Sequence, residues 1–190
     1  MRKLISYLVL LYLMLSQAEA QQIVTDRPDQ SDGAAIVETD KWQLETSLYY
    51  TRIDSHTHAF ISSSLLRYGV LKKFEARLLV EQGIKRNPFT TETAQSQFPL
   101  ALSAKWALLE ETKHQPAISM VGYLQLPFSN GTQAHQWSSA VLLIIEKEWS
   151  PVTVSLNAGP KQAAFSPEWS LQATGDIKIA FGTHLNVFAE

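Results

Sequence analysis

Apolar and polar residues alternate one by one through much of the chain, beginning at residues 42–51. The mostly apolar set there is Trp42, Leu44, Thr46, Leu48 and Tyr50, and the more polar set is Gln43, Glu45, Ser47, Tyr49 and Thr51. Successive side chains of a β-strand point to opposite faces, so a period of two predicts a strand with one apolar and one polar face.

The same alternation predicts strands further along the chain. It is clear in five segments: 74–85, 100–108, 118–126, 152–159 and 169–179. Residues 59–68 and 137–149 are also strand-like, but their patterns do not decide which side chains share a face. The first contains Ser62-Ser63-Ser64 and the second contains the apolar run 141–145. With the residues that follow position 183, the chain holds nine strand-like segments in all.

The connections between these segments differ in length. Residues 87–97 and 127–136 are long and polar, whereas 69–73, 150–151 and 182–183 are short. Long and short connections tend to alternate along the chain, which predicts an up-and-down order of antiparallel strands. That asymmetry is typical of outer-membrane barrels, which have long external loops and short periplasmic turns.

A soluble β-sandwich also alternates, so strand length and aromatic positions must distinguish it from a barrel. The predicted segments of about 10–13 residues exceed the usual five or six and match the length that crosses a bilayer at a tilt. Aromatic residues stand at segment ends, as interfacial belts require. They are Trp42, Tyr50, Phe74, Trp137, Trp149, Trp169 and Phe181. Together these features favour a barrel.

The first twenty residues have the three parts of an export signal. Arg2 and Lys3 give a positive start, residues 4–15 are almost wholly apolar, and Ala18 and Ala20 are small residues before a cleavage site. An uncleaved membrane helix is the alternative, but the apolar run is shorter than the roughly 20 residues that span a bilayer. We expect cleavage after Ala20 and function outside the cytoplasm.

Composition excludes several classes of protein. The chain has 190 residues, 45% hydrophobic and 18% charged, with a formal net charge of −2 and no cysteine. Disordered chains are poorer in apolar residues, and disulfide scaffolds need cysteines. No nucleic-acid partner is expected, because basic residues are neither in excess nor clustered beyond Lys72 and Lys73.

Six short motifs stand in order along the chain. They are Thr25-Asp26-Arg27-Pro28-Asp29-Gln30, Trp42-Gln43-Leu44-Glu45-Thr46, Leu66-Arg67-Tyr68-Gly69, Phe74-Glu75-Ala76-Arg77-Leu78, Lys105-Trp106-Ala107-Leu108-Leu109-Glu110-Glu111 and Phe188-Ala189-Glu190. This set resembles a family of Gram-negative outer-membrane proteins that is labelled as transporters or as "MetA-pathway of phenol degradation". The resemblance implies an exported β-barrel that transports small compounds, aromatic ones among them.

Members of that family look longer than this chain, and single-chain bacterial barrels have an even number of strands. Glu190 is also not the aromatic residue with which such barrels usually end. We therefore expect an all-β, antiparallel, up-and-down transmembrane β-barrel that is truncated at its C-terminus. Its expected parts are a signal peptide at 1–20, a polar N-terminal segment at 21–40 and the barrel domain at 41–190.

Seven charged residues have the strand parity that would point into the lumen of such a barrel. They are Glu45, Arg67, Glu75, Arg77, Glu81, Lys85 and Lys105. One interpretation is a charged constriction that filters polar solutes. The other, which we favour, is a network of salt bridges that neutralise one another and fill a small barrel.

A polar stretch ahead of the first strand supplies four further candidates: Asp26, Arg27, Asp29 and Gln30. The stretch is too polar for lipid. We expect it either to fold into the lumen as a plug or to act as a periplasmic tether. In the plug interpretation, Arg27 would pair with a wall carboxylate such as Glu45 or Glu75.

Catalysis and metal binding are weaker alternatives. His56 and His58 would share a face of a strand, as metal ligands can, but the segment is expected to be a loop and has no evident third ligand. A barrel hydrolase with a Ser and His pair is a different class, yet no Gly-x-Ser-x-Gly motif occurs. We expect no enzyme activity, no catalytic residue, no metal and no cofactor.

The leading hypothesis is therefore passage of small solutes through an outer-membrane β-barrel. The expected partners are outer-membrane lipid, a small solute and the barrel-assembly machinery during insertion. One alternative is a non-conducting structural or adhesion barrel whose loops at 86–97 and 127–136 meet partners. The other is a soluble periplasmic β-protein.

Overall fold

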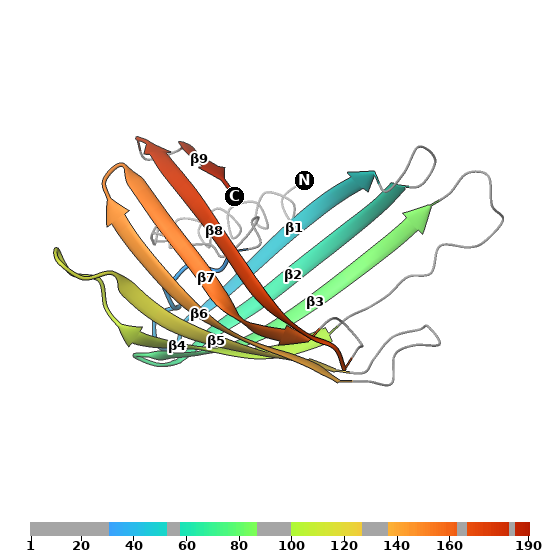
Figure 1. Cartoon of the computed structure of the whole chain (residues 1–190). Coiled ribbons are helices and arrows are strands. Elements are labelled where there is room, and N and C mark those ends of the chain that lie inside the picture. Colours follow the sequence, from blue (N-terminus) through green and yellow to red (C-terminus); the bar gives the residue numbers. More distant parts are fainter. Residues whose placement is uncertain (1–30, 53–57, 87–99, 127–136, 163–166, 183–184) are drawn as a thin grey trace, which may run out of the picture.

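The computed structural model describes residues 31–52, 58–86, 100–126, 137–162, 167–182 and 185–190, which form one sheet and no helix (Figure 1). Its strands are β1 (Trp42–Arg52), β2 (His58–Leu71), β3 (Phe74–Arg86), β4 (Leu100–Leu109), β5 (Ala117–Leu126), β6 (Ser138–Trp149), β7 (Val152–Gln162), β8 (Trp169–Phe181) and β9 (Leu185–Ala189). The expectation of an all-β structure with nine strand-like segments is confirmed. The predicted signal peptide at 1–20 lies outside the described residues.

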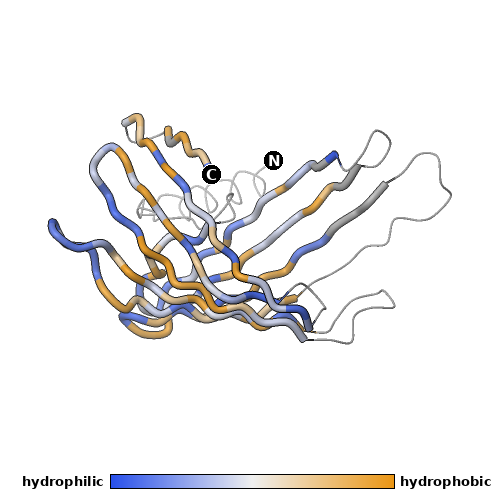
Figure 2. Tube along the Cα trace, in the orientation of Figure 1, coloured by the Kyte–Doolittle hydropathy of each residue, from blue (hydrophilic) through white to orange (hydrophobic). Residues whose placement is uncertain are grey.

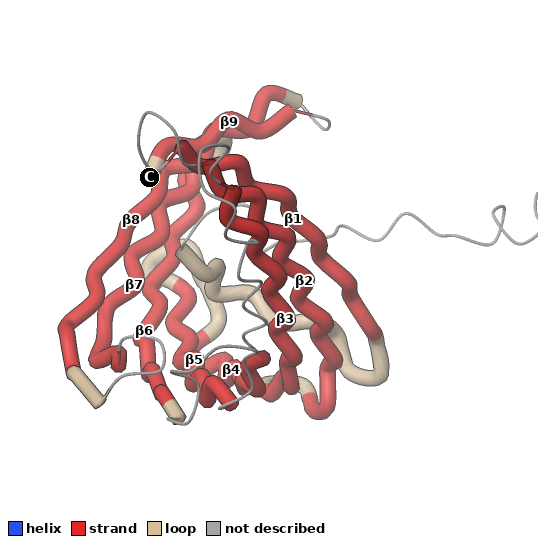
Figure 3. Tube along the Cα trace, turned by 90° about the vertical axis from the view of Figure 1, so that its right-hand side faces the viewer, coloured by secondary structure: helices blue, strands red, loops and turns tan. Residues whose placement is uncertain are grey.

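Each strand pairs with its neighbour in sequence, so the sheet order runs from β1 to β9. All eight pairings are antiparallel, which confirms the up-and-down order. The turns after β2 and β6 consist of Lys72-Lys73 and Ser150-Pro151 alone. Strands twist with a fixed hand, and the sheet curls around an interior, giving it a concave and a convex face (Figure 3).

The two faces of the sheet differ in chemistry. In β1, for example, Glu45 is 6% exposed on the concave face, whereas its neighbour Leu44 is 65% exposed on the convex face. Hydrophilic and hydrophobic positions alternate along the strands in the same way (Figure 2). The alternation predicted for this strand is therefore confirmed, with the polar set facing inward.

The structure resolves the two segments whose pattern was ambiguous. In β2, Ser63 is buried on the concave face, opposite Ser47 of β1 and Glu81 of β3. In β6, Leu142 and Ile144 are buried on the concave face. They form a small apolar core with Val121 of β5 and Ala34. The interior thus combines polar groups with one apolar patch.

Aromatic side chains gather near both ends of the strands. At the end with the two-residue turns stand Trp42, Tyr68, Trp106, Trp149 and Phe181, and toward the other end stand Tyr50, Phe60, Trp137 and Trp169. The rings of Trp42 and Tyr68 stack with centroids 4.4 Å apart, and those of Tyr50 and Phe60 lie 5.0 Å apart. We call these two groups the aromatic belts.

Residues 31–37, which we call the strap, cross the concave side of the sheet. At one end the Ser31 hydroxyl donates a hydrogen bond to Thr174 of β8. Beyond the strap's other end, the Asp40 N–H donates to the Gly69 carbonyl of β2 at 2.8 Å. Asp40 has a φ of 62°, a left-handed conformation that Asp tolerates better than most residues. The chain then enters β1.

Gly69 gives a test of how the strap is anchored. A Cβ at this position would lie 2.0 Å from the backbone oxygen of Glu38, so the chain after the strap would have to move. Gly69→Ala should therefore lower the free energy of unfolding by about 2 kcal/mol or more, measured by urea denaturation. Gly122→Ala is the control, because a Cβ there meets nothing within 4 Å. Equal midpoints for the two variants would contradict this account.

Candidate functional site

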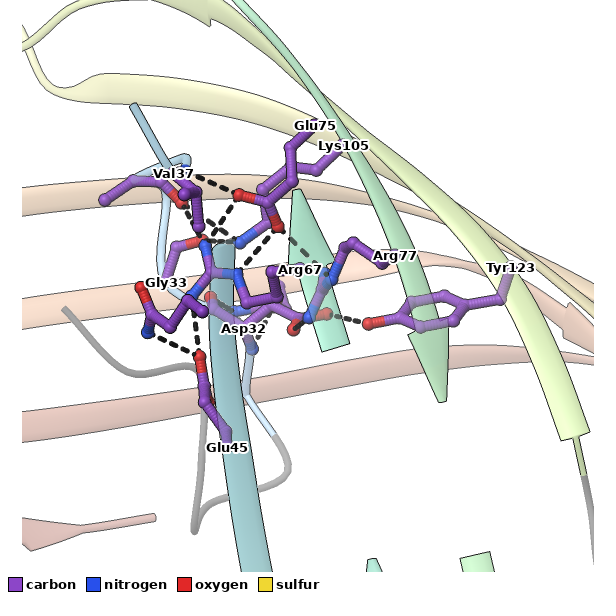
Figure 4. A network of polar contacts seen from close by, with 12 residues as sticks. Asp32, Gly33, Val37, Glu45, Arg67, Glu75, Arg77, Lys105 and Tyr123 are labelled. Carbon is purple, nitrogen blue, oxygen red and sulfur yellow. Dashed lines mark hydrogen bonds and ion pairs between the residues drawn. The ribbon is translucent and has the colours of Figure 1, made fainter. Parts of the chain in front are cut away.

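Arg67 of β2 is the centre of a buried network on the concave face (Figure 4). Its Nη1 donates to Glu45 Oε1 at 2.8 Å. Its Nε and Nη2 donate to the two carboxylate oxygens of Glu75 at 2.8 and 2.9 Å. All three side chains are nearly inaccessible to solvent. The planar guanidinium suits this arrangement, because its fixed donors match a carboxylate with two parallel bonds.

Strand register brings these charges together. Glu45 lies opposite Leu65 and Glu75 lies opposite Gly69, so each carboxylate is a diagonal neighbour of Arg67. Arg67 and Arg77 lie directly opposite each other on β2 and β3. Glu75 offsets the repulsion between these like charges, because its Oε1 lies 2.8 Å from Arg67 Nε and 3.5 Å from Arg77 Nε.

Side chains of the sheet bind the backbone of the strap. Lys105 Nζ of β4 donates to the Gly33 carbonyl at 2.8 Å, and Ser119 Oγ of β5 donates to the Ala34 carbonyl at 2.5 Å. Arg67 Nη2 donates to the Ala35 carbonyl at 3.1 Å. Buried backbone polar groups need partners, and these side chains supply what a neighbouring strand otherwise would.

Asp32 of the strap is bound on three sides. Arg77 Nη2 donates to Asp32 Oδ1 at 3.0 Å, and the Tyr123 hydroxyl of β5 donates to Oδ2 at 2.5 Å. Asn157 of β7 exchanges two hydrogen bonds with the Asp32 backbone: the N–H donates to Oδ1 at 3.1 Å and Nδ2 donates to the carbonyl at 3.0 Å. The Arg77 guanidinium also lies 5.6 Å from the Tyr123 ring centroid.

Five of the charged residues proposed from strand parity meet in this network: Glu45, Arg67, Glu75, Arg77 and Lys105. Glu81 lies farther along β3 and accepts a hydrogen bond from Ser63. Lys85 belongs to β3, but its side chain lies outside the described part of the structure.

The plug candidates Asp26, Arg27, Asp29 and Gln30 lie outside the described residues. The carboxylates expected to pair with Arg27 are Glu45 and Glu75, and in the structure both bind Arg67. The segment that the structure places on the concave side is the strap, immediately after these candidates.

Sequence reasoning missed Asp32, Ser119, Tyr123 and Asn157 as members of the network. The last three have the strand parity of the polar face, so that signal was present for them. The predicted set held charged residues alone, although hydroxyl and amide groups are equally able to bind a buried carboxylate or carbonyl. Asp32 carries no strand pattern, because it belongs to the irregular strap.

The described residues show no sign of a metal site or of a membrane-spanning helix. Among the described residues, no group of three or more His, Cys, Asp or Glu residues could hold a metal ion. His56 lies outside the described residues, as does the side chain of His58. No described helix is long and apolar enough to cross a membrane. Comparisons of the chain with protein-family models, curated proteins and solved structures give no match.

Removing the central cation should destabilise the protein strongly. Arg67→Met leaves Glu45 and Glu75 buried without their main counter-charge, which costs about 3–5 kcal/mol for a buried pair. The control is Lys73→Met, because Lys73 and Glu110 are 53% and 79% exposed and 3.9 Å apart. Such a surface pair contributes about 1 kcal/mol or less. The two variants should differ clearly in urea midpoint, and similar midpoints would argue against a structural role for the network.

Proposed function

We propose that this chain forms the wall of an outer-membrane β-barrel that passes small solutes, aromatic ones among them, through its polar interior. The main support for this proposal is the distribution of charged and apolar side chains over the two faces of the sheet. Charged groups are buried on the concave face, while large apolar side chains stand exposed on the convex face, such as Leu171 at 80% and Leu48 at 76%. A soluble antiparallel sheet has the opposite need, since it packs its apolar face against a core.

The extent of the apolar face supports a lipid environment. Exposed large apolar residues occur on every strand from β1 to β9, and no second layer covers them in the described part of the chain. Contiguous apolar patches of more than a few hundred Å² mark interaction or membrane surfaces. The export signal expected at 1–20 and the resemblance to outer-membrane transporters agree with this proposal.

Strand length and the aromatic belts support insertion across a bilayer. The strands β1 to β8 are 10 to 14 residues long, enough to cross a membrane at a tilt. Trp137 directly precedes β6 and Trp149 ends it, and Trp169 and Phe181 are the two end residues of β8. Aromatic rings prefer the level of the lipid headgroups, so two belts correspond to two membrane interfaces.

Passage through the interior is proposed to depend on charge and fit, without catalysis or a cofactor. The interior presents Arg77, Lys105, Tyr123 and Asn157 around the strap. These groups can orient a polar or ionic solute by hydrogen bonds. The non-conducting structural or adhesion barrel remains the second candidate, because the strap occupies part of the same interior.

Leu143 tests the lipid environment directly. It is 43% exposed on the convex face of β6, midway between Trp137 and Trp149. If that face lies in lipid, Leu143→Arg costs about 2–4 kcal/mol at the bilayer midplane. In water, the same exposed change is worth about 0.5 kcal/mol or less. The measurement is the fraction of chain folded into lipid vesicles as urea is varied.

His114→Arg is the matched control, since His114 is exposed in the connection between β4 and β5. It should insert as the parent chain does. If Leu143→Arg inserts equally well, the convex face does not lie in lipid, and the soluble periplasmic alternative is favoured.

Conductance tests the transport part of the proposal. The full chain, reconstituted in planar bilayers, should give stepwise currents that change when a permeating solute is added. Retention in the outer-membrane fraction after a high-salt wash should accompany these currents. A chain that stays in the membrane but carries no solute-dependent current would instead be a non-conducting barrel.

A further inference from the structure

We propose that Arg77 and Tyr123 form a binding site for a small carboxylate anion, and that the strap's own Asp32 occupies this site until a solute of the same chemistry displaces it. The binding site follows from the contacts around Asp32. Its role as a gate rests on the transport function proposed above.

The site has the features of a built carboxylate site. Each Asp32 side-chain oxygen accepts a hydrogen bond from a different donor, Arg77 on one side and Tyr123 on the other. Arg77 is 4% exposed, so its charge is held away from solvent, and Asp32 is the nearer of the two carboxylates beside it, at 3.0 Å against 3.5 Å for Glu75. The donors come from β3 and β5, whose backbones are fixed within the sheet independently of the strap.

Charge balance points to a single negative charge as the ligand. Among the described residues, the network contains three cations, Arg67, Arg77 and Lys105, against three carboxylates, Asp32, Glu45 and Glu75. Without Asp32, the wall of the site carries three cations and two carboxylates, an excess of one positive charge. A monoanionic carboxylate restores neutrality, whereas a cation or a neutral solute does not.

The strap is bound in a way that permits exchange. Its backbone joins no strand of the sheet and is held by side chains instead. Lys105 binds the Gly33 and Ala35 carbonyls, and Ser119 binds the Ala34 carbonyl. The Val37 N–H donates to Glu75 Oε2 at 2.6 Å. Water can replace such side-chain partners one at a time. The strap's buried apolar side chains are those of Ala34, which packs against Val121 and its neighbours, and Val37. Only these two are exposed when the strap leaves, so the hydrophobic cost of release is limited to about two small side chains.

A tethered ligand competes strongly with a free one. Asp32 is part of the same chain, so it reaches the site at an effective concentration in the millimolar range. A free carboxylate is therefore expected to bind weakly while Asp32 is present. Removal of the Asp32 carboxylate should reveal the affinity of the site itself.

Acetate is the first probe, because it is the carboxylate group of Asp32 on a methyl group. Calorimetry on the full chain in detergent should show acetate binding Asp32→Ala about tenfold or more tightly than the parent chain. Acetamide, the uncharged analogue, should bind neither. Glu38→Gln is the matched control, since it removes an exposed carboxylate just beyond the strap. It should bind acetate as the parent chain does.

The double variant Tyr123→Phe and Asp32→Ala tests the Tyr123 hydroxyl as a hydrogen-bond donor to acetate, with little risk to folding. Loss of a hydrogen bond to a charged group should weaken acetate binding about tenfold. Unchanged affinity in this double variant, equal affinity of Asp32→Ala and the parent chain, or equal binding of acetamide would each overturn the carboxylate site.

Release of the strap can be followed by thiol labelling, because the chain has no cysteine of its own. Ala34 is 3% exposed, so the thiol of Ala34→Cys should react slowly with a maleimide and faster as acetate is added. The thiol of the exposed control Thr39→Cys should react at a constant rate. Acetate binding without faster labelling of Ala34→Cys would overturn displacement.

These measurements do not require the protein to conduct. If acetate binds and labelling accelerates but no current flows in bilayers, the transport function fails and the carboxylate site stands. If current flows but Asp32→Ala gains no affinity for acetate, the transport function stands and the site is overturned.

Discussion

The buried guanidinium of Arg67 is the interaction on which the rest of the structure depends. A charge with about 1% of its surface exposed must be neutralised and hydrogen-bonded where it lies. Glu45 of β1 and Glu75 of β3 do this from either side, which requires the register of the first three strands. The same guanidinium also holds the Ala35 carbonyl of the strap. Pairing of one cation therefore links strand register to the position of a segment outside the sheet.

This arrangement differs from that of a water-soluble sheet. The apolar core on the concave side is small, with Ala34, Val121, Leu142 and Ile144 as its buried members. Beside this core, side chains of the wall hold the strap's backbone by hydrogen bonds. The strap thus stabilises the buried charges and at the same time occupies the space that a solute would need. Under the proposed transport function, stability and passage oppose each other at this place, and the proposed exchange of the Asp32 contact would reconcile them.

Much of the fold could be predicted from the alternation alone, because the direction of a strand side chain is a local property of the backbone. The inward positions of Glu45, Glu75 and Lys105 followed from parity. The pattern left the inward face undecided where neighbouring residues did not differ in polarity. Ser62 to Ser64 are chemically alike, and residues 141–145 are all apolar, so only pairing with neighbouring strands decided which of them face inward. The contacts of the strap were beyond prediction for a related reason, since an irregular segment has no period.

The sequence by itself determined that this chain forms long antiparallel strands with an apolar and a polar face, since side-chain alternation needs only a few consecutive residues. The tertiary structure decided which polar groups meet. Asp32 is 45 residues from Arg77, 91 from Tyr123 and 125 from Asn157 along the chain. No local pattern relates such distant positions. They converge because the curl of the sheet and the register of its strands carry three separate side chains to one point on the concave face, where the strap crosses.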